Sequence, residues 1–112
     1  RINAEDPRTF MPSPGVISGW ALPEGAGVRV DSHAEAGYRV PPHYDSMIAK
    51  LIVHGPTRAE ALARMRGALE AMRVEGIATN LTLHRRLLQD DAFATGGVDI
   101  HHLERWLRQP GA

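Results

Sequence analysis

The sequence predicts an α+β fold, with a small antiparallel sheet or partial barrel in the first half, followed by two to three helices packed on it. Seven of the eight prolines lie before residue 57, where they break the chain into short pieces. Short apolar segments in that half have the two-residue period of strands, whereas residues 57–108 carry apolar residues at helical spacing. Strands first and helices after is the order typical of an α+β domain.

Three segments of the first half have the pattern of strands, namely residues 15–20, Val28–Ser32 and residues 47–54. In the second segment the valines would face one side, and Arg29 and Asp31 the other. The third segment is the strongest, because every second residue is apolar. A glycine-rich turn at 23–27 precedes the second segment. Pro41-Pro42 excludes a central strand just before the third, because proline donates no ladder hydrogen bond.

The second half begins with a clear helix signal. Thr57 and Glu60 have the spacing of a capping box, in which the threonine oxygen accepts a hydrogen bond from the Glu60 amide. An apolar stripe then follows at helical spacing, formed by Leu62, Met65, Leu69 and Met72.

Three further elements are predicted after this helix. Residues 74–77 have the pattern of one more short strand. Asn80 is expected to cap a second helix over residues 81–89. Gly96-Gly97 breaks the chain, and Asp99 is expected to cap a last short helix over residues 100–107.

Composition narrows the possible functions. The 112 residues fit one domain, and the 13 basic and 13 acidic residues cancel, so charge gives no reason to bind nucleic acid or an anionic membrane. There is no cysteine, which fits a reducing compartment, and no apolar run approaches the roughly 18–20 residues of a membrane span. We expect a cytoplasmic protein. Because the chain begins at Arg1 without a methionine, we interpret it as a fragment of a longer polypeptide or as a processed chain.

Arg1 heads an extended segment, R-I-N-A-E-D-P, in which Ile2 and Ala4 would face inward and Asp6-Pro7 would start a turn. A guanidinium is a planar, permanently charged donor that suits a carboxylate, bicarbonate or a developing enolate oxygen. The alternative interpretation is that Arg1 frays in solvent as the first residue.

Residues 40–50, V-P-P-H-Y-D-S-M-I-A-K, combine a stiff bend with an acid and the only lysine. Asp45 can accept backbone amides or pair with an arginine, and a rigid corner capped by Asp45 is the alternative to a catalytic role. Lys50 is expected to lay its stem on apolar surface. Arg29 and Asp31 are expected to lie on a solvated face of their strand.

Several kinds of site are not predicted. The six histidines include no pair four residues apart, and without cysteines we expect no metal site. The sequence contains neither G-x-x-x-x-G-K-[ST] nor G-x-G-x-x-G, so a phosphate-binding loop is not indicated.

Taken together, several blocks in order resemble the C-terminal subdomain of biotin carboxylase, the ATP-dependent part of acyl-CoA carboxylases and pyruvate carboxylase. They are R-I-N-A-E-D-P (1–7), P-S-P-G (12–15), G-V-R-V-D-S (27–32), V-P-P-H-Y-D-S-M-I-A-K (40–50), G-I-A-T-N (76–80) and I-H-H-L-E (100–104). The resemblance extends from Arg1 to about Leu107. It implies that residues 1–112 are one domain of a larger ATP-grasp enzyme.

The resemblance also implies roles for particular residues. In the family, the arginine of the R-I-N-A-E-D-P segment contacts bicarbonate and the ureido oxygen of biotin, and Arg1 is the matching position. Arg29 and Asp45 match positions at the dimer interface, where the acid can pair with an arginine of the partner. Many bacterial relatives carry an aromatic residue at the position of Ala26, so this alanine implies a weaker homodimer.

The implied reaction is the ATP-dependent carboxylation of biotin by bicarbonate, a ligase activity. The implied cofactors are biotin on a carrier domain, with ATP and Mg²⁺ bound by upstream parts of the parent, and none is expected within this fragment, which should be inactive alone. The implied partners are the rest of the biotin carboxylase chain, the biotin carboxyl carrier domain, a carboxyltransferase and a possible second copy, with no nucleic acid and no membrane. Two alternatives stay open: a structural or dimerisation module without a catalytic role, and the equivalent subdomain of another ATP-grasp ligase, such as a purine-pathway carboxylase.

Overall fold

The computed structural model describes residues 1–109, and its elements follow the predicted order of strands before helices. The first half contains β1 (Ile2–Asn3), β2 (Gly15–Val16), β3 (Gly19–Ala21), β4 (Val28–Ser32), β5 (Arg39–Val40) and β6 (Met47–Val53). The second half contains α1 (Arg58–Ala71), β7 (Arg73–Glu75), α2 (Leu81–Leu87), α3 (Asp91–Thr95) and α4 (His102–Leu107). The predicted α+β class is confirmed.

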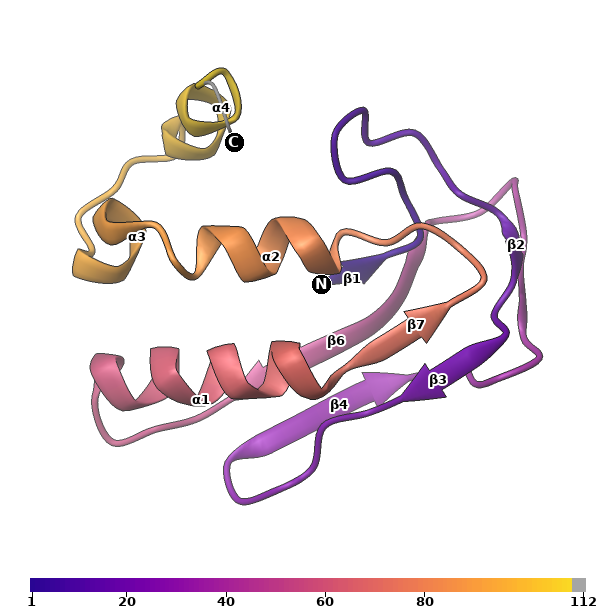
Figure 1. The fold of residues 1–112 in the computed structure, drawn as a ribbon, viewed down its shortest axis with the longest axis horizontal. Coiled ribbons are helices and arrows are strands. Elements are labelled where there is room, and N and C mark those ends of the chain that lie inside the picture. The colour runs from indigo at the N-terminus through magenta and orange to yellow at the C-terminus, as the bar shows by residue number, and fades with distance from the viewer. Residues whose placement is uncertain (110–112) are drawn as a thin grey trace.

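The strands form three small antiparallel sheets, with the orders β1-β6-β4, β2-β5 and β3-β7. This is the first of the two predicted forms, and residues 1–109 contain no closed barrel. Figure 1 shows α1 lying over β6, with α2 running back antiparallel beside α1. The long strand β6 is therefore central, because it pairs with a strand on each edge and supports the first helix on one face.

Residues 15–20 were predicted as one strand, and this prediction is wrong in its continuity. The segment divides into β2, which pairs with β5, and β3, which pairs with β7. The partner changes between the two strands: the Ile17 amide donates to the Tyr38 carbonyl, whereas the Ser18 amide donates to the Glu75 carbonyl. Ile17 and Ser18 belong to neither strand, so the pairing partner changes from β5 to β7 between Val16 and Gly19.

The core joins the sheet to the helices. The largest fully buried side chains are Ile2, Ile17, Ile48 and Met72. Removing each such side chain from water contributes roughly 1.5–3 kcal/mol. Ile48 is buried, whereas Lys50 and Ile52, which alternate with it along β6, are exposed. The inward positions of Ile2 and Ala4 are confirmed.

Two arginines hold α1 and α2 together, because each helix contributes an arginine that caps the carboxyl end of the other. Arg66 of α1 donates to the Leu88 carbonyl at the end of α2 (3.0 Å). Arg85 of α2 donates to the carbonyls of Leu69 (2.9 Å) and Met72 (2.8 Å) at the end of α1. The last carbonyls of a helix lack partners and carry partial negative charge, so a cation there satisfies both the hydrogen bond and the dipole.

The predicted caps had different outcomes. The Thr57 hydroxyl accepts from the Glu60 amide (3.2 Å), as expected. Asn80 occupies the N-cap position of α2, as predicted, but its side chain makes no capping hydrogen bond to the helix. Asp99 accepts from the His101 amide (3.0 Å), and the last helix begins at His102, two residues later than predicted.

The short helix α3 was not predicted from the sequence. Asp90 caps it by accepting from the Phe93 amide (3.1 Å). The same carboxylate contacts Nε2 of His102 at 2.8 Å and so ties α4 to the start of α3. Five residues are too few to give a periodic apolar pattern, which explains the omission.

Candidate functional site

The Arg1 guanidinium lies beside the loop that leads into β6. Its Nε donates to Sδ of Met47 (3.3 Å), and its Nη2 lies 3.4 Å from Oδ2 of Asp45. The Asp45 carboxylate is held in turn by the Met47 amide (2.9 Å). The structure thus brings together two of the residues singled out in the sequence, Arg1 and Asp45, which are 44 positions apart.

This ion pair is open to solvent. The side chains of Arg1 and Asp45 are 61% and 67% exposed. Exposed ion pairs contribute about 0–1 kcal/mol, because water screens the charges. The guanidinium can therefore exchange Asp45 for another anion or polar oxygen at little cost.

The backbone at Arg1 is anchored, in contrast to the exposed side chain. Ile2 pairs with Ala49 and Asn3 with Met47, so the following residues form the edge strand β1. The Arg1 carbonyl accepts from two side chains of the chain's second half, Nδ2 of Asn80 (3.2 Å) and Nε2 of His84 (2.8 Å). The sequence contained only a weak signal for these contacts, since both residues lie near the G-I-A-T-N block but 79 and 83 positions from Arg1.

The segment after β1 forms the predicted turn. The Asp6 carboxylate accepts from the amides of Arg8 (2.8 Å) and Thr9 (3.0 Å). These two amides hold the pKa of Asp6 below its usual value, with the Thr9 amide contributing most. The whole R-I-N-A-E-D-P segment is thereby fixed from the edge of the sheet to the turn.

Arg29 lies on β4, on the other side of β6 from Arg1. Its guanidinium makes a two-bond contact with Asp31, with distances of 3.0 and 3.1 Å. Asp31 raises the pKa of Arg29 through these hydrogen bonds. Both side chains are largely exposed, and Asp31 faces Lys50 in the strand register. Arg29 is therefore part of an exposed, charged sheet face, and β6 lies between it and the strand that Arg1 precedes.

A cavity of about 140 Å³ lies behind Arg1, and its wall is mostly apolar. It is lined by Arg1, Ile2, Leu51, Met65, Leu69, His84 and Leu88. Burial lowers the pKa of His84, and the hydrogen bond to the Arg1 carbonyl opposes that effect. His84 is therefore a neutral imidazole at pH 7, and its single N–H donates a hydrogen bond to the Arg1 carbonyl.

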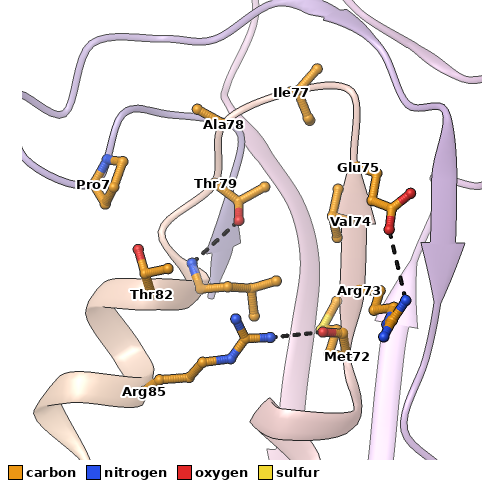
Figure 2. Close-up of a pocket in the computed structure, with 11 residues that line it drawn as sticks. Pro7, Met72, Arg73, Val74, Glu75, Ile77, Ala78, Thr79, Thr82 and Arg85 are labelled. Atoms are coloured by element: carbon orange, nitrogen blue, oxygen red, sulfur yellow. Dashed lines mark hydrogen bonds and ion pairs between the residues drawn. The ribbon is translucent and has the colours of Figure 1, made fainter.

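A larger groove, of about 370 Å³, lies between β7 and the start of α2. Figure 2 shows that its arginines are already engaged: Arg85 turns to the Met72 carbonyl, and Arg73 lies 3.9 Å from Glu75. A third cavity, of about 310 Å³, is lined by residues that include Tyr38, Tyr44 and Asp45. The chemistry concentrates at Arg1 and not in the groove between β7 and α2.

Two kinds of feature are absent from the part of the chain that the structure describes. Residues 1–109 contain no cluster of three or more histidine or acidic side chains placed to hold a metal ion. None of the helices within these residues has the length and apolar character needed to cross a membrane.

The fold and the Arg1 segment match known proteins over almost the whole chain. The family model of the biotin carboxylase C-terminal domain matches residues 1–105. The chain is 59% identical over 107 residues to a biotin carboxylase of Pseudomonas aeruginosa, covering 96% of this chain and 24% of that protein. It is 48% identical over 108 residues to a biotin-dependent acyl-coenzyme A carboxylase alpha3 subunit of Mycobacterium leprae, covering 96% and 18%.

Solved structures agree. The biotin carboxylase domain dimer of the Hydrogenobacter thermophilus 2-oxoglutarate carboxylase, in complex with MgADP, ADP and bicarbonate, superimposes with a TM-score of 0.91 at 42% identity. That match covers 94% of this chain and 23% of the other. The fold is thus that of a domain within a biotin-dependent carboxylase. The chain belongs to the biotin carboxylase C-terminal domain family, and it spans about a quarter of the length of the curated relatives it matches most fully.

Proposed function

We propose that this chain is the C-terminal domain of a longer, cytoplasmic biotin carboxylase and that Arg1 acts in the ATP-dependent carboxylation of biotin. One observation carries the proposal: the Arg1 guanidinium is exposed and only loosely paired, while its backbone is anchored by the sheet and by α2. A fixed backbone with a free, charged, forked donor suits an oxygen that gains charge during a reaction.

In the proposed reaction, the γ-phosphoryl group of ATP passes to bicarbonate and gives ADP and carboxyphosphate. Biotin, the second substrate, then gives its N1 proton to a general base in the upstream part of the parent, and negative charge develops on its ureido oxygen. The bond between N1 and the carboxyl carbon forms as the bond from that carbon to the phosphate oxygen breaks, and phosphate leaves. Arg1 donates hydrogen bonds to the ureido oxygen and to bicarbonate, which stabilises the charge where it develops.

The remaining machinery belongs, in this proposal, to the part of the parent that precedes residue 1. Relatives support this division, since a structure of a Campylobacter jejuni biotin carboxylase is a complex with a β,γ-ATP analogue, and the present chain covers 24% of it. ATP and Mg²⁺ would bind there, biotin would arrive on a carrier domain, and a carboxyltransferase would use the product. The 112 residues alone should therefore not hydrolyse ATP.

We also assign a second copy of the chain as partner of the exposed sheet face and corner that carry Arg29 and Asp45. Their exposure supports this assignment, and the 2-oxoglutarate carboxylase relative is a domain dimer. Sedimentation of the parent at several concentrations tests it. A charge reversal, Arg29→Glu, should shift the parent towards monomer, and an unchanged monomer–dimer equilibrium would count against the interface.

The catalytic role is tested in the full-length parent by Arg1→Lys, which keeps the positive charge but removes the planar fork. We expect carboxylation of free biotin to fall by about 10²–10³-fold, the range for loss of one oxyanion donor. Carboxylation at the parent's rate would refute the catalytic role and would favour a domain that serves structure or dimerisation alone.

A further inference from the structure

The carbonyl oxygen of Arg1 accepts hydrogen bonds from two side chains: Asn80, which directly precedes α2, and His84 in its first turn. Nδ2 of Asn80 donates to it at 3.2 Å and Nε2 of His84 at 2.8 Å. The two residues are four positions apart, so they project from the same side of the helix. Figure 1 shows the N-terminus of the chain lying beside this end of α2.

Asn80 binds the free edge of β1 in the manner of a neighbouring strand. Its backbone N–H donates to the Asn3 backbone carbonyl (3.2 Å), and its side-chain oxygen accepts from the Asn3 backbone N–H (2.9 Å). With the bond to Arg1, this makes three hydrogen bonds between one residue and two residues of the edge. Asn80 is the only polar residue among residues 1–109 that is classed as buried, at 6% exposure. Burying a polar side chain costs free energy unless its groups are paired, and here both ends of the amide are paired.

His84 completes this clamp from within the apolar cavity. The imidazole is half-buried beside Leu88, Leu69 and Met65, which keeps it neutral. A neutral imidazole has one N–H, and the carbonyl can only accept, so the proton lies on Nε2. The bond to Arg1 is shorter than the Asn80 bond, and it fixes the carbonyl from a second direction.

β1 alone holds Arg1 poorly. It is two residues long, and its register with β6 shifts between Ile2 and Asn3. Arg1 precedes the strand, and within residues 1–109 the bonds that hold its carbonyl come from Asn80 and His84. Without them the peptide after Arg1 can rotate, and the guanidinium moves with it.

We propose that Asn80 and His84 are positioning residues, which orient the Arg1 backbone so that its guanidinium points at the reacting oxygen of the substrate. This inference rests on the proposed role of Arg1 and deepens it. A displacement of about 1 Å at a reacting group can lower a rate by roughly 10²-fold, so the clamp has a measurable kinetic consequence.

The test uses the full-length parent with three substitutions at position 84. His84→Leu places an apolar side chain of similar size in the cavity and removes the hydrogen-bond donor. His84→Gln keeps an N–H that can reach the Arg1 carbonyl. His84→Met gives a second donor-free variant that adapts to the cavity if the leucine protein folds poorly. The exposed His101 provides the matched control, since His101→Leu makes the same change at the start of α4.

Two products are measured for each variant: ADP formed with bicarbonate, and carboxybiotin formed from free biotin. A partly unfolded enzyme loses both in proportion. A misdirected Arg1 loses much more carboxybiotin than ADP, because charge develops on the ureido oxygen only after the phosphoryl transfer to bicarbonate. We expect His84→Leu and His84→Met to lower the ratio of carboxybiotin to ADP by about 10- to 100-fold. His84→Gln should restore the ratio of carboxybiotin to ADP to within about threefold of the parent's ratio.

The inference is overturned if the donor-free variants keep the parent's ratio, or if ADP and carboxybiotin fall together and glutamine gives no rescue. Arg1→Lys, measured in parallel, separates this outcome from failure of the proposed function. If Arg1→Lys alone lowers the ratio, the role of Arg1 stands and the positioning role of His84 fails. If Arg1→Lys leaves the ratio unchanged, the proposed function itself fails.

Discussion

Arg85 closes the carboxyl end of α1, and its replacement by methionine removes that closure while keeping an unbranched apolar stem. Two hydrogen bonds are lost, to the carbonyls of Leu69 (2.9 Å) and Met72 (2.8 Å). A hydrogen bond from a charged donor contributes about 1.5–3 kcal/mol, and the helix dipole adds about 0.3–1 kcal/mol. Because the adjoining groove of about 370 Å³ admits water to the freed carbonyls, the lower end applies. We expect a loss of about 2–4 kcal/mol in the free energy of unfolding.

Urea denaturation of the 112-residue chain, followed by tryptophan fluorescence, measures this loss. Arg73→Met is the matched control, because Arg73 lines the same groove (Figure 2) but is 73% exposed and lies 3.9 Å from Glu75. Its loss should cost no more than about 0.5 kcal/mol. Arg85→Lys should fall between the two, since lysine cannot form the two-carbonyl fork. If the Arg85 and Arg73 methionine variants differ by less than about 1 kcal/mol, the capping argument is refuted.

Two further predictions concern the stability of the chain. Because burial lowers the pKa of His84, its neutral form contributes stability that is complete above the unfolded pKa of about 6.5 and is lost as the pH falls towards the folded pKa. His84→Gln should therefore flatten the fall in unfolding free energy between pH 7 and 5, and equal slopes for both proteins would contradict the assignment. Gly76 has φ +98°, and a Cβ there would meet the Val16 carbonyl and lie 2.8 Å from the Ser18 amide, so Gly76→Ala should cost about 1–3 kcal/mol in urea denaturation. Gly67 lies within α1, where an added Cβ meets no other atom, so Gly67→Ala should instead raise the free energy of unfolding by about 0.5–1 kcal/mol. If both glycine variants change the free energy of unfolding in the same direction, this geometry is contradicted.

The features that sequence alone predicted are those governed by neighbouring residues. The Thr57 cap depends on Glu60, three positions away, and the alternation in Val28–Ser32 depends on the strand itself. Both are confirmed, because the period of a strand and the geometry of a first helical turn are local properties.

The features that were missed depend on contacts between distant segments. Asn80 has the residue type of a cap, but its side chain pairs with Asn3, 77 positions earlier, and this alternative is invisible in the local pattern. The division of residues 15–20 depends likewise on which segments lie beside Ile17 and Ser18. For the site, the resemblance identified Arg1, and the three-dimensional arrangement added its pairing with Asp45 and the clamp on its carbonyl.

The most direct test of the account is the ratio of carboxybiotin to ADP formed by the full-length parent carrying Arg1→Met. The substitution removes every donor of the guanidinium and leaves the upstream ATP-dependent step to the rest of the enzyme. We expect carboxybiotin formation to fall by about 10²–10³-fold and bicarbonate-dependent ADP formation to fall far less. Carboxybiotin formed at the parent's rate, with the parent's ratio to ADP, would contradict it.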